Sequence, residues 1–167
     1  ATAERGAWGL RDRDVFAAAR TAIASLRRGG RPFLVVISTV DGHLPGSPAA
    51  SCPAQGPAAQ RAQACADLAL LRFLSDVTSD GVFSDVAVVV TADHAAPDLP
   101  VVRAAMPPGA AGSFAEIPLI IASPGLKPSV RRVSGGQLDL PATLAARLGL
   151  PPLPGVDVVR AAGGGRI

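Results

Sequence analysis

Three short runs of apolar, mostly β-branched residues stand out along the chain, at 33–39, 86–91 and 117–122. Within each run the apolar positions follow one another almost without a break and do not alternate with polar ones. Runs of this kind are typical of strands that are buried on both faces, as in a parallel sheet covered by helices. The pattern therefore predicts three buried strands of one mostly parallel sheet.

Three other segments have the apolar spacing of helices: 13–28, 58–77 and 140–148. Asp12 and Asp139 stand where the N-caps of the first and third segments belong. Gly29 and Gly149 follow the same two segments as helix stops. The order helix, strand, helix, strand, strand, helix predicts an α/β fold in which helices sandwich the sheet.

The composition favours one globular domain. The chain has 167 residues, 49% of them hydrophobic, which is enough for one core. We expect the domain to cover 1–160 and the glycine-rich end, 161–167, to be a flexible tail. No apolar run approaches the roughly 20 residues that span a bilayer, so any membrane anchor or export signal is expected outside this segment. The net charge of +3 is scattered along the chain, so nucleic acid is not expected as a partner.

The two histidines of the chain occupy equivalent places, each just beyond the carboxyl end of a predicted strand. His43 follows Asp41 after the first strand, and His94 follows Asp93 after the second. Ligands of open α/β sheets bind at the carboxyl ends of strands, so both pairs are expected to face a crevice. Carboxylate and imidazole together suit Zn²⁺ or Mn²⁺, and a neutral imidazole can also donate its N–H to a phosphate oxygen. The spacing alone fits two ordinary loop histidines equally well.

The two cysteines, Cys52 and Cys65, lie on either side of a stretch rich in Pro, Gly and Gln. A disulfide between them would close a short loop, would stabilise the fold by about 3 kcal/mol and would imply an oxidising compartment. Two small buried thiols in a reducing compartment fit the same spacing. The residues alone leave both alternatives open.

An ordered series of motifs resembles the periplasmic phosphoglycerol transferases that modify glucans. The series is WGLRDRDVF from Trp8, PFLVVISTVDGHLPG around His43, Ser51-Cys52, Cys65-Ala66-Asp67, and VAVVVTADH ending at His94. Those transferases belong to the alkaline phosphatase and sulfatase superfamily, with lipoteichoic acid synthases, phosphoethanolamine transferases and arylsulfatases. The resemblance extends from Trp8 to about Leu150. It implies that the chain is the C-terminal portion of such a catalytic domain.

The resemblance also implies roles for individual residues. Asp93 and His94 match the paired ligands of one catalytic divalent metal ion, Mn or Zn. His43 matches the histidine that contacts the substrate phosphate. Trp8 lies where a related aromatic residue can wall the headgroup pocket, although a lone tryptophan also suits a packing role. Cys52 and Cys65 match two cysteines of the family, which implies a disulfide in an exported protein.

Other parts of the family pattern are missing or changed. The nucleophilic Thr or Ser and the remaining metal-binding carboxylates lie upstream of anything that matches this chain, so no catalytic nucleophile is expected in it. Ser38, Thr39 and Thr91 match strand positions of the family and not its nucleophile. Gly42 replaces the usual Thr, which would leave His43 less rigidly held.

The function implied by the resemblance is metal-dependent transfer of a phosphoglycerol group to a periplasmic glucan. The donor would be phosphatidylglycerol or an already modified glucan, and the whole protein would be periplasmic and anchored in the inner membrane. Without the upstream half, this segment should turn over little substrate. A phosphoethanolamine transferase or a sulfatase-like hydrolase on the same scaffold stays open as an alternative. A non-catalytic binding or assembly domain is the alternative from another class.

Overall fold

The computed structural model describes residues 4–6, 8–105, 114, 116–130 and 134–161. Their contacts divide the chain into two compact units. Unit 1 is Ala1–Val82 with Pro97–Ala111, and unit 2 is Phe83–Ala96 with Gly112–Ile167. Within the described part of the chain, no helix is long and apolar enough to cross a membrane.

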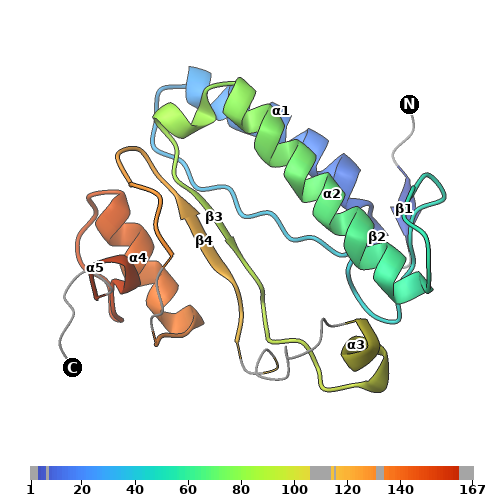
Figure 1. Cartoon of the computed structure of the whole chain (residues 1–167). Helices are drawn as coiled ribbons and strands as arrows, with labels where there is room; N and C mark the ends of the chain where they lie inside the picture. Colours follow the sequence, from blue (N-terminus) through green and yellow to red (C-terminus); the bar gives the residue numbers. More distant parts are fainter. Residues whose placement is uncertain (1–3, 7, 106–113, 115, 131–133, 162–167) are drawn as a thin grey trace. The chain divides into compact units, whose positions relative to one another are not determined.

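Unit 1 is built on two helices that lie side by side, α1 (Asp12–Arg28) and α2 (Ala58–Ser79), as Figure 1 shows. Both confirm the predicted helices. The ring of Phe16 stacks on that of Phe73, with centroids 4.8 Å apart. The buried apolar residues of unit 1 are Phe16, Ala19, Ile23, Ala59, Ala62, Phe73, Val77 and Val82. Burial of these facing side chains is what holds the two helices together.

The start of α1 differs from the prediction. Arg11 occupies the N-cap position, and Asp12 is the first helical residue. The carboxylate of Asp12 accepts hydrogen bonds from the backbone N–H groups of Val40, at 2.7 Å, and Asp41, at 3.1 Å. Asp12 therefore ties the helix to the loop that follows the first apolar run, and does not cap its own helix.

The first apolar run, 33–39, is extended but has no ladder partner among the described residues. Its side chains alternate in exposure: Leu34 and Val36 are 72% and 80% exposed, whereas Val35 between them is half-buried. The prediction that this run is a strand buried on both faces is therefore wrong for the described chain. Apolar composition favours an extended, buried segment, but a ladder also needs the backbone groups of a neighbouring strand.

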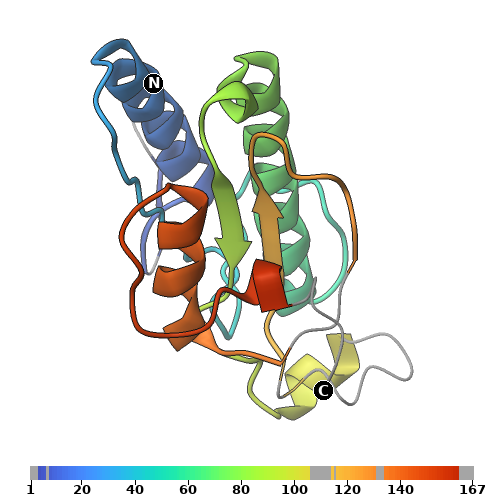
Figure 2. The same cartoon turned by 90° about the vertical axis from the view of Figure 1, so that its left-hand side faces the viewer.

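Unit 2 contains two paired strands, β3 (Val88–Thr91) and β4 (Leu119–Ala122), which lie within the second and third predicted runs. They run antiparallel, with Val89 opposite Ile121, as the opposed arrows in Figure 2 show. The expectation of a mostly parallel sheet is corrected here, because the ladders that the described residues form are antiparallel. An apolar run indicates burial but not strand direction, which depends on the path of the connecting chain.

The third predicted helix is confirmed as α4 (Leu140–Arg147), which follows the 3₁₀ turn η3 (Gln137–Asp139). Asp139 stands at the N-cap of α4, as predicted, but its carboxylate bonds elsewhere. It accepts the backbone N–H groups of Gly136 and Val156, each at 2.9 Å. These two bonds, the one from Gly136 first, hold the pKa of Asp139 below its ordinary value. Asp139 thus joins the start of α4 to the segment that follows the helix.

Three short elements lack a pattern long enough to be predicted: the hairpin of β1 (Arg5–Gly6) and β2 (Gly9–Leu10), α3 (Pro100–Ala105) and α5 (Val158–Ala161). The expected tail, 161–167, begins at the last residue of α5. Residues 162–167 lie outside the described part of the chain. The assignment of 1–160 to one catalytic domain stays a prediction.

A disulfide joins Cys52 to Cys65, with the two Cα atoms 5.8 Å apart. It confirms the bond that the family resemblance implies. Because Cys65 belongs to α2, the bond fastens the long loop before the helix to the helix itself. Arg61, on α2, also binds this loop, because its Nε donates a hydrogen bond to the carbonyl oxygen of Ala54 at 2.9 Å.

We expect replacement of both cysteines, Cys52→Ser with Cys65→Ser, to lower the free energy of unfolding by about 3 kcal/mol, because the open loop gains entropy in the unfolded chain. Urea unfolding of the two proteins measures the difference. A reductant should destabilise the wild type by a similar amount and leave the double variant unchanged. Equal stability of the two proteins under oxidising conditions would contradict the prediction.

Candidate functional site

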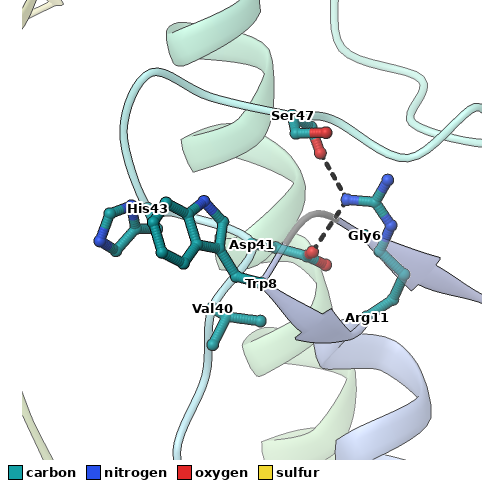
Figure 3. Close-up of a pocket in the computed structure, with 7 residues that line it drawn as sticks. All are labelled: Gly6, Trp8, Arg11, Val40, Asp41, His43 and Ser47. Carbon is teal, nitrogen blue, oxygen red and sulfur yellow. Dashed lines mark hydrogen bonds and ion pairs between the residues drawn. The ribbon is translucent and has the colours of Figure 1, made fainter.

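The hairpin before α1 presents Trp8 to the loop that carries His43. Trp8 lies between β1 and β2, and its side chain is 57% exposed. The rings of Trp8 and His43 are 4.1 Å apart between centroids and inclined at 37° (Figure 3). The structure therefore brings together the two residues that the resemblance placed at a substrate headgroup.

A small open hollow lies beside this ring pair. It has about 210 Å³ of open space, part of which is continuous with solvent. Its walls come from the hairpin, the start of α1 and the loop 40–47: Gly6, Trp8, Arg11, Val40, Asp41, His43 and Ser47 (Figure 3). The hollow thus combines an aromatic face, an imidazole and an ion pair within unit 1.

Arg11 supplies the ion pair, and its guanidinium is already engaged. One nitrogen, Nη1, donates to Oδ1 of Asp41 at 3.1 Å and to the carbonyl oxygen of Ser47 (Figure 3). Arg11 is 8% exposed. A Cβ at Gly6 would come within 2.9 Å of this Nη1, so the glycine leaves room for the guanidinium. Asp41 balances the charge of Arg11, and both side chains line the hollow.

Asp41 and Asp12 bond to each other's backbone. Oδ2 of Asp41 accepts the backbone N–H of Asp12 at 3.0 Å, while Oδ1 of Asp12 accepts the backbone N–H of Asp41 at 3.1 Å. The other oxygen of Asp12, Oδ2, is buried and has no hydrogen-bond partner among the described residues. Loss of hydration raises the pKa of Asp12, and outweighs the hydrogen bonds that it accepts.

The ring of His43 is oriented by its own loop. Nδ1 lies 2.7 Å from the carbonyl oxygen of Leu44. A carbonyl can only accept, so Nδ1 carries the proton and Nε2 of the neutral ring has a lone pair. In this orientation Nε2 can bind a cation, but it can donate to a phosphate oxygen only as imidazolium. The sequence-based idea that a neutral imidazole donates to phosphate therefore needs this correction.

Asp93 and His94 lie at the end of β3 in unit 2, and their side chains are 88% and 71% exposed. Nε2 of His94 is 3.6 Å from Oδ2 of Asp93. Nδ1 of His94 lies 2.8 Å from the carbonyl oxygen of Ala95, so Nε2 again has the lone pair in the neutral ring. A carboxylate oxygen and an imidazole nitrogen this close suit a shared Zn²⁺ or Mn²⁺ ion.

The pair is nevertheless an incomplete metal site. Among the residues that the structure describes, no three side chains of His, Cys, Asp or Glu are grouped so that they could hold a metal ion. A catalytic zinc site usually has three protein ligands. The pair alone falls short of that number, and the metal role of Asp93 and His94 stays a prediction.

Two further residues touch these loops and were missed by sequence reasoning. Nε2 of Gln63 donates to the carbonyl oxygen of Gly42 at 2.7 Å. Nε2 of Gln137 donates to the carbonyl oxygens of Ala92, at 2.7 Å, and of Asp93. Nothing in the sequence marks either glutamine, because polar residues at exposed helical positions are common.

Comparison with solved structures supports the fold. The lipoteichoic acid synthase LtaP of Listeria monocytogenes matches with a TM-score of 0.75 and 19% identity, over 90% of this chain and 43% of that chain. A protein in the alkaline phosphatase superfamily from Vibrio parahaemolyticus matches with a TM-score of 0.75 and 24% identity, over 93% of this chain and 38% of that chain. The expected α/β fold is therefore confirmed.

The family follows from the sequence model that describes sulfatases, which matches residues 2–150. The chain belongs to the sulfatase family. It spans about two fifths of the length of the two structures it resembles. No curated protein matches the chain.

The raised pKa of Asp12 sets an expected pH dependence of stability. The native carboxyl keeps its proton to a higher pH than the unfolded one, so wild-type stability falls as pH rises from the ordinary value of 3.8 through the raised pKa. Asp12→Asn keeps an acceptor oxygen and cannot ionise. We therefore expect the variant to gain stability relative to the wild type as pH rises through this window, measured by urea unfolding at pH values between about 3 and 7.

Asp14, in the same helical turn, is the matched control. The backbone N–H of Glu4 donates to its carboxylate at 2.8 Å and holds its pKa below 3.8. Its contribution is present above that pH and is lost as pH falls through the lowered pKa. Asp14→Asn should therefore lose stability relative to the wild type as pH rises. The same pH trend in both variants would contradict the assignment to Asp12.

Proposed function

We propose that this chain is the C-terminal part of a metal-dependent enzyme that transfers a substituted phosphate group, with phosphoglycerol as that group. The observation that carries the proposal is the pair Asp93 and His94, which presents two suitable ligand atoms at a strand end in a sulfatase-family fold. The motif series from Trp8 onward resembles phosphoglycerol transferases. One of the structural neighbours is a lipoteichoic acid synthase.

Asp93 and His94 would hold one divalent ion, Mn or Zn, through Oδ2 and Nε2. The ion would activate a hydroxyl nucleophile and neutralise charge on the phosphorus oxygens. The remaining ligands and the nucleophile would come from polypeptide upstream of Trp8. Ser38 and Thr39 are exposed residues at the end of the run 33–39, and Thr91 is exposed at the end of β3. We assign none of them as the nucleophile.

Trp8 and His43 would bind the substrate. The exposed face of Trp8 suits the carbon skeleton of a small headgroup such as glycerol. As imidazolium, His43 would donate from Nε2 to a phosphate oxygen, while Nδ1 stays on the carbonyl of Leu44. The ion pair of Arg11 and Asp41 keeps the loop of His43 against the hairpin. These residues bind and orient the ester, which is the part of catalysis that positioning supplies.

The proposed donor is phosphatidylglycerol or a modified glucan, and the proposed acceptor is a glucan of the periplasm. The disulfide of Cys52 and Cys65 supports an extracytoplasmic location, because such bonds persist in oxidising compartments. We place the whole protein in the periplasm, held to the inner membrane by polypeptide outside this chain. The family model supports a second candidate, a sulfatase-like hydrolase on the same scaffold.

The test uses a protein in which this chain is joined to the upstream half of a sulfatase domain. We expect Mn²⁺-dependent release of diacylglycerol from phosphatidylglycerol, and a loss of at least about 100-fold in His94→Ala, since even outer partners of metal ligands are worth 10–100-fold. Gln60→Ala, at an exposed site on α2, is the control and should keep full activity. The chain by itself should show little or no turnover.

Two other results would change the proposal. If the joined protein leaves the lipid intact but binds Mn²⁺ through His94, the substrate must be another phosphate or sulfate ester. If His94→Ala releases diacylglycerol as fast as the parent, the metal role of Asp93 and His94 is wrong.

A further inference from the structure

The backbone of each histidine loop is bound by the side-chain amide of one glutamine from another element of the chain. Gln63, on α2, donates from Nε2 to the carbonyl oxygen of Gly42 at 2.7 Å, directly before His43. Gln137, in the turn η3, donates from Nε2 to the carbonyl oxygens of the two residues directly before His94. The two glutamines lie in different units and on different elements. Each nevertheless binds the carbonyl oxygen of the residue directly before its histidine.

The histidines share a second contact. Nδ1 of His43 lies 2.7 Å from the carbonyl oxygen of Leu44, and Nδ1 of His94 lies 2.8 Å from that of Ala95. In each loop the glutamine therefore fixes the backbone just before the histidine, while the ring bonds to the backbone just after it. Both ends of the short segment are restrained, and the ring presents Nε2 outward with its lone pair.

The lack of a side chain at Gly42 leaves room for the amide of Gln63. A Cβ at this position would come within 3.2 Å of both Nε2 and Oε1 of Gln63, which is tighter than ordinary contact. The φ angle of Gly42 is not among the positive values, so space and not backbone freedom explains the glycine. The residue that was expected to loosen His43 instead gives Gln63 room to hold the loop.

We propose that Gln63 and Gln137 are positioning residues that set the tautomer of His43 and His94, each acting only on its own loop. The use of Nε2 as a metal ligand or phosphate donor rests on the proposed function. The tautomer itself does not, because it depends on hydrogen bonds within each unit. A neutral histidine side chain in water carries its proton mainly on the other nitrogen, Nε2. A ring that keeps its proton on Nδ1 would therefore show that the loop sets the tautomer.

The first experiment is long-range ¹H–¹⁵N NMR of the whole 167-residue chain at about pH 8.5, where imidazole is neutral. The spectrum contains two histidine rings only. We expect both wild-type rings to be Nδ1–H tautomers. Gln137→Ala should move His94 toward the Nε2–H tautomer and leave His43 unchanged, and Gln63→Ala should do the reverse.

Gln60→Ala is the matched control, because Gln60 lies on α2 near Gln63 but its amide donates to the carbonyl oxygen of Ala104, at 3.4 Å, and to neither histidine loop. It should change neither ring. Gln137→Glu is a second variant that keeps the length of the side chain and removes the N–H donor, and it should reproduce the tautomer change of Gln137→Ala. A ring that keeps its tautomer after loss of its own glutamine, or two rings that change together, would overturn the proposal.

A titration with Zn²⁺ then separates this proposal from the proposed function. Wild-type His94 should shift on addition of Zn²⁺, and Gln137→Ala should weaken that binding by about 10-fold or more, the usual loss for a partner that orients a metal ligand. Gln63→Ala should leave the Zn²⁺ affinity of His94 unchanged. If wild-type His94 does not respond to Zn²⁺, the two residues do not bind the ion by themselves and their metal role is decided in the joined protein, while the tautomer result still decides whether the glutamines position the rings.

Discussion

The exchange of hydrogen bonds between Asp12 and Asp41 is the interaction on which the candidate site of unit 1 depends. Each carboxylate accepts the backbone N–H of the other residue, so the start of α1 and the end of the extended run are joined from both sides. Arg11 can then reach Asp41 and Ser47, and the loop brings His43 against Trp8. This arrangement removes the carboxyl of Asp12 from water, which raises its pKa and leaves its Oδ2 without a hydrogen-bond partner among the described residues. Native proteins tolerate such a cost where the buried contact also fixes a conformation.

The same principle recurs in the two histidine loops. Neither loop belongs to a helix or strand, so its backbone groups need partners from elsewhere. Gln63 and Gln137 supply them at the residues before each histidine, and the histidine ring supplies one at the residue after. In unit 2, Asp139 extends the network by bonding to Gly136 and Val156 on either side of α4. In both units, hydrogen bonds between side chains and loop backbone thus fix the conformation of the loops that carry the candidate site residues.

The sequence predicted some of this arrangement and missed the rest for identifiable reasons. The helical spacing around Phe16 and Phe73 located α1 and α2, because periodic burial leaves a clear pattern over many turns. The run 33–39 has the composition of a strand and yet lacks a ladder partner in the described chain, because pairing depends on a second segment that composition does not specify. The sequence placed His43 and His94 after apolar runs, but it did not identify the glutamines that bind their loops. Each glutamine lies more than 20 residues from the loop that it binds, and no local pattern links the two.

By itself, the sequence determined the helices, the apolar runs, the α/β class, the pairing of Cys52 with Cys65 through the family motifs, and the candidates at the ends of the runs. These are local or motif-bound properties, set by side-chain periodicity and residue order. Only the tertiary structure decided the antiparallel direction of β3 and β4, the tautomer of the two histidines and the engagement of Arg11 with Asp41. The strand pairing and the ion pair join residues far apart in the chain, and each tautomer depends on a contact between the ring and the next residue's carbonyl that only the folded loop conformation sets.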